Sequence, residues 1–239
     1  MNYLLFLFFG IAPSLLWLAY YLRKDTHPEP RQMIALIFIM GMVATIPAIV
    51  IELALRYGLE LVFDASLPLL FFYMFAGVAF VEEFMKYVVF RIGIIGNSNI
   101  QEMDEPVDFI IYMIIAGLGF AAAENIIILL GLGPQAPLSE IVSLSALRLV
   151  GATFLHALAS GAIGYFLALG AFRAKRKHIY LGSGLLLAAA LHGFFNIYII
   201  RGEGAPQWVF PVIILIGLAL FTTFAFHQTK RMKSTTLSK

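Results

Sequence analysis

Seven apolar stretches, each about as long as a membrane-spanning helix, constrain this chain more than any other feature of its sequence. A helix needs about 20 mainly apolar residues to cross the hydrocarbon core of a bilayer. Polar segments rich in Gly, Pro and charged residues separate the stretches. They cover residues 2–22, 32–56, 67–91, 106–131, 141–172, 178–200 and 207–227. We therefore predict an all-α, polytopic membrane protein with about seven transmembrane helices.

The composition of the chain excludes several other classes of protein. Of its 239 residues, 61% are hydrophobic and 13% are charged, more apolar surface than a soluble domain of this length can bury. The absence of cysteine excludes disulfides, thiolate metal ligands and a cysteine nucleophile. The net charge of only +2 gives no sign of a nucleic-acid partner, and we expect none. We treat residues 1–239 as a single integral-membrane domain in the cell membrane, with its functional helices in about 67–200 and a basic cytoplasmic tail at 228–239.

The distribution of basic residues predicts the orientation in the membrane. If the N-terminus is outside and the C-terminus is cytoplasmic, the cytoplasmic side receives twelve Lys and Arg residues and the outer loops only two. The twelve are Arg23, Lys24, Arg31, Arg91, Arg173, Lys175, Arg176, Lys177, Lys230, Arg231, Lys233 and Lys239. The outer two are Arg56 and Arg201. This excess of basic residues follows the positive-inside rule.

The third apolar stretch contains three ionisable residues in the segment FVEEFMKYVVF. Glu82, Glu83 and Lys86 cost about 2.5–3.5 kcal/mol each near the centre of a membrane helix, while each Leu, Ile, Phe or Val returns only about 0.3–0.6 kcal/mol. The two sums nearly cancel, so these charges have to face the interior of the bundle. Lys86 follows the glutamates by four and three residues and so can neutralise one of them within the helix. Only one of the two glutamates can point at a given place, because successive residues of a helix are about 100° apart.

Three further helices carry polar residues in a similar pattern. The segment GFAAAEN places Phe120 and Glu124 one turn apart, and small neighbours allow another helix to approach. The segments FLHALASGAIG and LHGFFN do the same for His156 with Ser160 and for His192 with Asn196. At a rise of 1.5 Å per residue, a shared site at the midplane or in the outer half of the membrane is expected.

Carboxylates, imidazoles and an amide in one buried site indicate hydrolysis without a covalent nucleophile. A carboxylate could deprotonate water that a histidine orients, and a His/Asn pair could stabilise the developing oxyanion. Alternatively, zinc could be bound by the Glu and His side chains, with Glu82, Glu124, His156 and His192 as its ligands. A cofactor is not required by the first interpretation.

The four motifs together resemble those of the PrsW family of intramembrane proteases, which is part of the larger group of glutamate-dependent CAAX prenyl endopeptidases and bacteriocin-processing enzymes. EEFMK resembles the family's EExxK motif, and FAAAE resembles its FxxxE motif, where CAAX-type relatives have FxxxH. HALAS and HGFFN resemble the two remaining motifs. The similarity extends over about residues 12–200.

This resemblance implies cleavage of a single-pass membrane protein near the outer face of the membrane. In the best-known members of the family the substrate is an anti-sigma factor. By similarity, Glu82 would be the general base, supported by Glu83 and Lys86.

The resemblance also implies roles for the other motif residues. His156 or Glu124 would position the water, and His192 with Asn196 would form the oxyanion site. Phe120 and Ser160 are expected to support these groups. The FxxxE motif leaves open whether Glu124 binds water, shares a proton or holds a metal.

Two functions of other classes remain open at this stage. A non-catalytic scaffold similar to the anterior-pharynx-defective subunit of gamma-secretase would also have seven helices and an outer N-terminus. A proton-coupled carrier would also need intramembrane carboxylates and histidines, although no internal repeat is visible. A serine mechanism using Ser160 would leave the glutamates unexplained. The oligomeric state is unknown.

Some polar and aromatic residues have ordinary structural explanations. Asp104, Glu105 and Asp108 surround Pro106 and are typical of the start of a helix. Trp17 and Trp208 fit the pattern of anchors at a membrane interface.

Overall fold

The computed structural model of the chain describes residues 3–25, 27–62, 67–96, 103, 105–172, 177–201 and 203–232. Throughout these residues, helices are the only regular secondary structure. Seven helical spans are long and apolar enough to cross a membrane. They are Tyr3–Leu22, Arg31–Leu59, Pro68–Ile95, Asp108–Leu130, Leu138–Ala171, Lys177–Arg201 and Gln207–Arg231. The predicted all-α membrane fold with seven spans is confirmed.

Several of the spans consist of more than one helical segment. In chain order the segments are α1 (Tyr3–Leu22), α2 (Arg31–Val62), α3 (Leu67–Phe72), the π-helix η1 (Tyr73–Ala79), α4 (Phe80–Phe90), the π-helix η2 (Arg91–Gly96), α5 (Asp108–Leu130), α6 (Leu138–Val150), α7 (Ala152–Phe172), α8 (Lys177–Arg201) and α9 (Pro206–Arg231).

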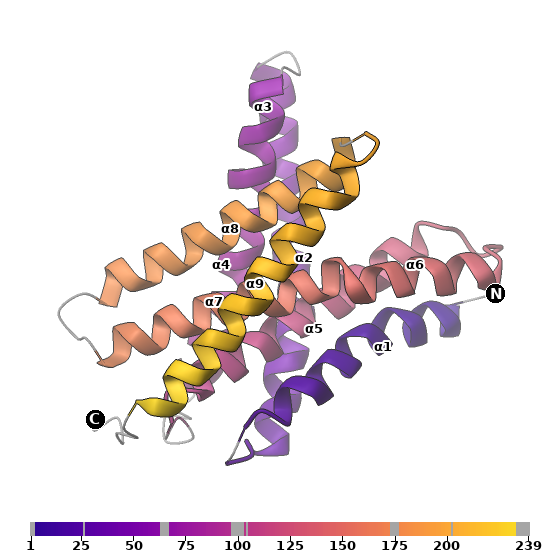
Figure 1. The fold of residues 1–239 in the computed structure, drawn as a ribbon. Helices are drawn as coiled ribbons and strands as arrows, with labels where there is room; N and C mark the ends of the chain where they lie inside the picture. Colours follow the sequence, from indigo (N-terminus) through magenta and orange to yellow (C-terminus); the bar gives the residue numbers. More distant parts are fainter. Residues whose placement is uncertain are drawn as a thin grey trace.

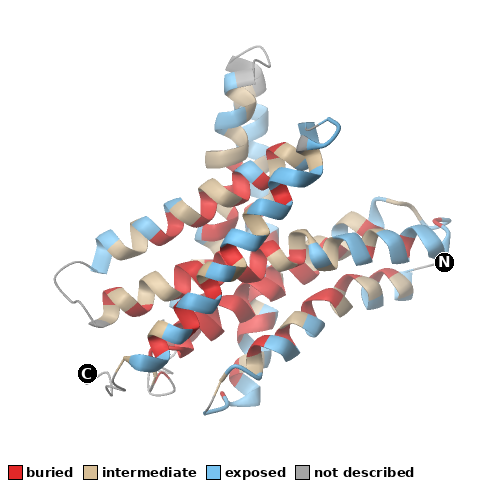
Figure 2. Ribbon diagram, in the orientation of Figure 1, coloured by how far each residue is buried: buried red, intermediate tan, exposed pale blue. Residues whose placement is uncertain are grey.

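Helix α5 forms the centre of the bundle. It packs against α1, α2, α4 and α7, and every residue in 108–122 is buried. In its most apolar window 67% of the residues are buried, compared with 22% for α1. Figure 2 shows the same contrast, because the buried residues gather where the helices cross and the exposed ones follow the outer faces. A membrane helix that is buried on all sides is held by its neighbours, while the exposed apolar faces of α1, α2 and α9 are suited to contact lipid.

Two glycines bring other helices close to α5. A Cβ on Gly119 would collide with the backbone carbonyl of Phe38 in α2. A Cβ on Gly117 would lie 2.9 Å from the carbonyl oxygen of His156 in α7, too close for any real contact. Small residues therefore let α2 and α7 contact α5 directly, as predicted for the segment before Glu124. The close contact with α7 places His156 beside the helix that carries Glu124.

The third span changes its helical period just before the paired glutamates. In η1 the hydrogen bonds follow the wider π pattern, and the N–H of Phe80 donates to the carbonyl of Phe75, five residues earlier. A π-helical turn contains more residues than an α-helical turn, and such turns are frequent at functional sites. The sequence predicted only an apolar helix here. The π-turn rotates α4 relative to α3, so it helps to set the direction of Glu82 and Glu83.

The fifth predicted stretch, 141–172, is two helices rather than one. Gly151 ends α6 with an irregular backbone (φ −101°, ψ −101°), and α7 begins at the next residue. At this break the carbonyl of Leu149 accepts a hydrogen bond from the indole Nε1 of Trp17, at 2.8 Å. Trp17 also stacks on Phe154, with ring centroids 4.0 Å apart, so it supports the break as well as facing the surface. A broken helix at membrane depth is tolerated because neighbouring groups satisfy its backbone.

The predicted orientation rests partly on segments outside the described residues. Arg173, Lys175, Arg176, Lys233 and Lys239 lie in such segments, as does Asp104. Helix α9 continues to Arg231, four residues beyond the predicted end of the seventh stretch, so the first part of the predicted tail is helical. In Figure 1 the N-terminal end of α1 and the C-terminal end of α9 lie at distant corners of the bundle.

Candidate active site

The three ionisable residues of α4 are buried and paired with one another. Lys86 Nζ lies 2.7 Å from Glu83 Oε1 and 3.7 Å from Glu82 Oε2, and the side chains of Lys86 and Glu83 have no exposed surface. Lys86 can reach both glutamates because residues three and four apart share a helix face, and its contact with Glu83 is the closer one. Glu82 points to a different place from Glu83, as expected for adjacent residues of a helix. Lys86 therefore compensates charges that would otherwise be too costly inside the bundle.

His156 of α7 lies between two carboxylates. Its Nε2 is 2.8 Å from Glu124 Oε2 of α5, and its Nδ1 is 3.8 Å from Glu82 Oε2. An ionised carboxylate only accepts hydrogen bonds, so Nε2 carries the proton and donates it to Glu124. The lone pair of Nδ1 then faces α4, where Lys86 Nζ lies 2.6 Å away.

His192 of α8 repeats this arrangement with its nitrogens exchanged. Its Nδ1 lies 2.9 Å from Glu83 Oε1, so this nitrogen is the donor. The Nε2 atom keeps its lone pair and lies 3.8 Å from Glu82 Oε2. The rings of His156 and His192 are 5.0 Å apart and nearly perpendicular.

One oxygen of Glu82 is therefore the point on which the two imidazoles converge. Glu82, His156 and His192 each offer a ligand atom, and these three atoms all lie within 4.8 Å of one another. Glu82 Oε2 is buried and accepts no hydrogen bond from any described residue. Tetrahedral zinc has bonds of about 2.0–2.2 Å, which separate its ligands by roughly 3.3–3.5 Å, close to the 3.8 Å of the two Glu82–imidazole distances.

The chemistry of this donor set fits a divalent metal ion. One carboxylate with two imidazoles is a known catalytic zinc set. The other nitrogen of each imidazole donates its N–H to a carboxylate, as in metal-bound histidines. Of the four ligands predicted from the sequence, Glu82, His156 and His192 come together. Glu124 instead bonds to the far nitrogen of His156. An ion bound at His156 Nδ1 would have to replace the hydrogen bond from Lys86.

Arg148 and Asn125 extend the site and were not predicted as part of it. Arg148 Nη2 of α6 lies 2.9 Å from Glu124 Oε2, and its Nε donates to Asn125 Oδ1. The amide nitrogen of Asn125 donates to Thr153 Oγ1 at 3.0 Å. The sequence did contain a signal for each of them: Arg148 is a lone arginine in an apolar helix, and Asn125 directly follows Glu124. They could not be interpreted without knowing which helices are neighbours.

Phe120 and Ser160, the predicted supporting residues, both border the site. The Phe120 ring lies 4.8 Å from Lys86 Nζ, a cation–π distance, and 5.8 Å from the ring of His156. Ser160 is fully buried beside Gly117, and its hydroxyl makes no hydrogen bond to a described residue. Because the Ser160 hydroxyl is hydrogen-bonded to neither histidine, a serine nucleophile activated by histidine has no support in this geometry.

Asn196 lies one turn beyond His192 on α8 and is half-buried. Within the described part of the chain it makes no hydrogen bond to the groups around Glu82. Its oxyanion role stays a prediction.

Two histidines and three glutamates gathered from four apolar spans form a cluster in the interior of a membrane protein whose chemistry suits hydrolysis or metal binding. The sequence over residues 29–224 matches the profile of the family described as PrsW family intramembrane metalloprotease. The chain belongs to this family of membrane-embedded proteases.

Individual relatives agree with this assignment over nearly the whole chain. The chain is 31% identical to Protease PrsW of Oceanobacillus iheyensis over 228 residues, which are 95% of this chain and 96% of that one. It is 27% identical to Protease PrsW of Bacillus subtilis over 227 residues, 94% of each chain. It is 29% identical to Protease PrsW of Geobacillus kaustophilus over 195 residues, 81% of this chain and 79% of the relative. No solved structure matches the fold significantly.

Proposed function

We propose that this protein hydrolyses a peptide bond of a single-pass membrane protein inside the membrane, at the site formed by Glu82, His156 and His192. One observation carries the proposal: His156 Nδ1 and His192 Nε2 each lie 3.8 Å from the same Glu82 oxygen, and both rings are held by carboxylates on their other side. A structural ion pair would need only Lys86 and one glutamate. Membership of a protease family supports the same function.

The site is proposed to work with a divalent metal ion, zinc being the one that its ligands suit best. Glu82, His156 and His192 would hold the ion, which when bound would polarise the peptide carbonyl and acidify the attacking water. The description of the family as intramembrane metalloproteases supports this form. In the alternative, metal-free form, Glu82 would itself take the proton of the water.

The surrounding residues are proposed to orient and neutralise the reacting groups. Glu83 and Glu124 would fix the tautomers of His192 and His156, so that the unprotonated nitrogen of each ring lies on the side of Glu82. Lys86 balances the carboxylate charge from its position beside Glu83. We retain Asn196 as the donor to the developing oxyanion, because it projects from the same helix one turn from His192.

The substrate is proposed to be a single-pass membrane protein of the anti-sigma-factor type, cut in the outer half of the bilayer. The resemblance of the motifs supports this class of substrate. The excess of basic residues on the side of the C-terminus supports a cut in the outer half of the bilayer. With this orientation the α5–α6 loop and the α8–α9 loop would lie outside.

The test compares protein N-termini in the membranes of cells that express either the wild type or Glu82→Ala at matched levels. A new N-terminus in or beside a single-pass segment, found only with the wild type, is the expected result. A chelator should remove the same N-terminus and added zinc should restore it. Cleavage by the Glu82→Ala protein at the wild-type rate would refute the site, and cleavage that persists in chelator would refute the metal.

A proton-coupled carrier is the second candidate, because one observation favours it. Side chains from Arg148 through Glu124, His156 and Lys86 to Glu83 form a continuous polar chain inside the bundle. Such chains also build proton relays. Proton flux through proteoliposomes that contain only this protein, without any cleavage, would favour the carrier. A partner that co-purifies in a fixed ratio and is unaffected by Glu82→Ala would instead favour a non-catalytic scaffold.

A further inference from the structure

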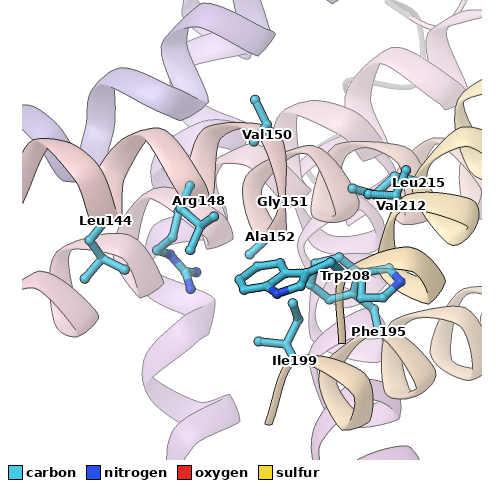
Figure 3. Close-up of a pocket in the computed structure, with 12 residues that line it drawn as sticks. Leu144, Arg148, Val150, Gly151, Ala152, Phe195, Ile199, Trp208, Val212 and Leu215 are labelled. Atoms are coloured by element: carbon cyan, nitrogen blue, oxygen red, sulfur yellow. The ribbon is translucent and has the colours of Figure 1, made fainter. Parts of the chain in front are cut away.

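A pocket lies beside the site, between the α6–α7 break and helices α8 and α9. Its volume is about 240 Å³, and it is lined by residues of all four helices. Figure 3 places Leu144 and Arg148 at one end of this pocket and Val212 and Leu215 at the other, with the Trp208 indole between the helix break and Ile199. No motif of the sequence pointed to it.

The pocket shares its walls with the helices that carry the site. Arg148 lines the pocket and pairs with Glu124. Ala152 lies one turn before His156 on α7, and Phe195 lies between His192 and Asn196 on α8. A group held in the pocket is therefore within a helical turn, in sequence, of the residues proposed to act on the peptide bond.

The chemistry of the pocket suits an apolar group. Arg148 is the one ionisable residue among those that line it, and its guanidinium is already bonded to Glu124 and Asn125. The other lining residues are aliphatic, aromatic, glycine or proline. A cavity of about 150 Å³ is enough to bind benzene, so this larger pocket can hold an aromatic or branched aliphatic side chain.

The entrance of the pocket lies on the exposed outer surface of the apolar spans. Trp208 and Val212 are each 51% exposed, and Val150 on the opposite rim is 60% exposed. A segment of a transmembrane protein can reach such an entrance by diffusing in the plane of the bilayer, without passing through water. Gly151 has no side chain at this rim, and a Cβ there would be in ordinary van der Waals contact with the Phe195 ring, at 3.7 Å.

We propose that this pocket receives one large apolar side chain of the membrane-protein substrate and so positions the neighbouring peptide bond at Glu82. This inference rests on the proposed proteolysis, but binding to the pocket can be measured without it. The pocket would make the enzyme select for a branched aliphatic or aromatic residue near the cleaved bond.

The test measures binding with defined peptides and an inactive protein. The probes are synthetic transmembrane peptides of about 24 residues, long enough to span a bilayer, each with a photoactivatable diazirine leucine at one position. They are reconstituted with the Glu82→Gln protein in phosphatidylcholine nanodiscs, and the cross-linked residues are identified by mass spectrometry. Peptides with the diazirine at one depth should cross-link to the residues that line the pocket.

A matched pair of variants separates the pocket from the general lipid-facing surface. Val212→Trp fills the pocket from α9, whereas Ile213→Trp places the same bulk on the adjacent residue, which is 56% exposed and does not line the pocket. Val212→Trp should lower the cross-linking yield by at least about tenfold, the usual effect of losing one apolar contact in a specific pocket. Ile213→Trp should leave the yield unchanged.

Two results would overturn the inference. Equal yields for the two tryptophan variants would show that the peptide binds elsewhere. Labelling of the pocket by a diazirine phospholipid that the peptides do not displace would show that it is a lipid groove. Failure of the proposed function looks different: the wild type would then produce no new N-terminus in cells, while the peptides would still cross-link to the pocket.

Discussion

Two compact clusters of His, Asp and Glu side chains in the described part of the chain are built in opposite ways. The Glu82 centre consists of Glu82, His156 and His192, and the Asp25 corner consists of Asp25, Glu105 and Asp108 near the ends of α1 and α5. In each, the potential ligand atoms lie within 4.8 Å of one another.

The Asp25 corner serves the turns of the backbone. Asp25 accepts the N–H of His27 at 3.0 Å, and Asp108 accepts the N–H of Glu105 at 2.7 Å. Glu105 also pairs at 2.7 Å with the ring of His27, which is 69% exposed. This agrees with the prediction that Glu105 and Asp108 mark the start of a helix.

The Glu82 centre, by contrast, is made of side chains from three helices, and its two histidines are held by hydrogen bonds to other side chains of the bundle. All three of its residues are buried, and one acceptor atom at its middle makes no hydrogen bond to a described residue. The comparison shows that proximity of acidic groups does not identify a site. Burial of all three residues and their orientation by further side chains do.

The largest contrast is expected from removing one carboxylate charge in each cluster. Glu82→Gln should lower the rate of cleavage by about 10²–10⁴-fold, the usual contribution of a residue that activates water. Glu105→Gln should leave it close to the wild-type rate. The measurement is the appearance of the wild-type-specific N-terminus over time in purified membranes. A similar loss in Glu105→Gln would mean that the corner takes part in the reaction.

The second contrast concerns stability. Lys86→Met leaves buried carboxylates without their cation and should lower the free energy of unfolding by about 3–5 kcal/mol. His27→Ala removes only an exposed pair and should cost about 0.2–1 kcal/mol. Thermal unfolding in detergent micelles measures both. Equal effects would show that the interior is better solvated than its burial suggests.

The third prediction tests whether Glu124 orients the ring of His156. Glu124→Gln keeps the shape of the side chain but weakens the bond to His156 Nε2, so zinc affinity should fall by about 10–100-fold. Equilibrium dialysis with zinc measures the affinity without any substrate. Glu105→Gln is the control and should bind zinc as the wild type does. An unchanged affinity in Glu124→Gln would remove Glu124 from the support of the site.

The fourth prediction concerns a hydrogen bond near the corner, the 2.5 Å bond that Tyr112 donates to the buried Glu29. Tyr112→Phe should lower the free energy of unfolding by about 1.5–3 kcal/mol, because a bond to a charged acceptor is lost. Zinc affinity should stay at the wild-type value. A loss of zinc binding in this variant would show that the two regions are coupled through α5.

The residues of the site were largely predictable from the sequence, but their arrangement was not. Charged residues in an apolar helix are costly wherever they occur, so Glu82, Glu83 and Lys86 stood out without any structure. Arg148 was equally unusual, yet its partner Glu124 is 24 residues away on another span. The sequence did not indicate which faces of the two helices meet.

By itself the sequence determined what depends on local periodicity and on solvent: seven apolar spans, and Lys86 within reach of both glutamates on one helix. The length of a span follows from the thickness of the bilayer, and neighbours within a helix follow from 3.6 residues per turn. Only the tertiary structure decided that Glu82, not Glu124, joins the two histidines, that α6 and α7 are separate, and that a pocket lies between them and α9. These features depend on how helices rotate and pack against one another. Packing is set by the shapes of small and large side chains at each contact, and hydropathy along the chain does not record it.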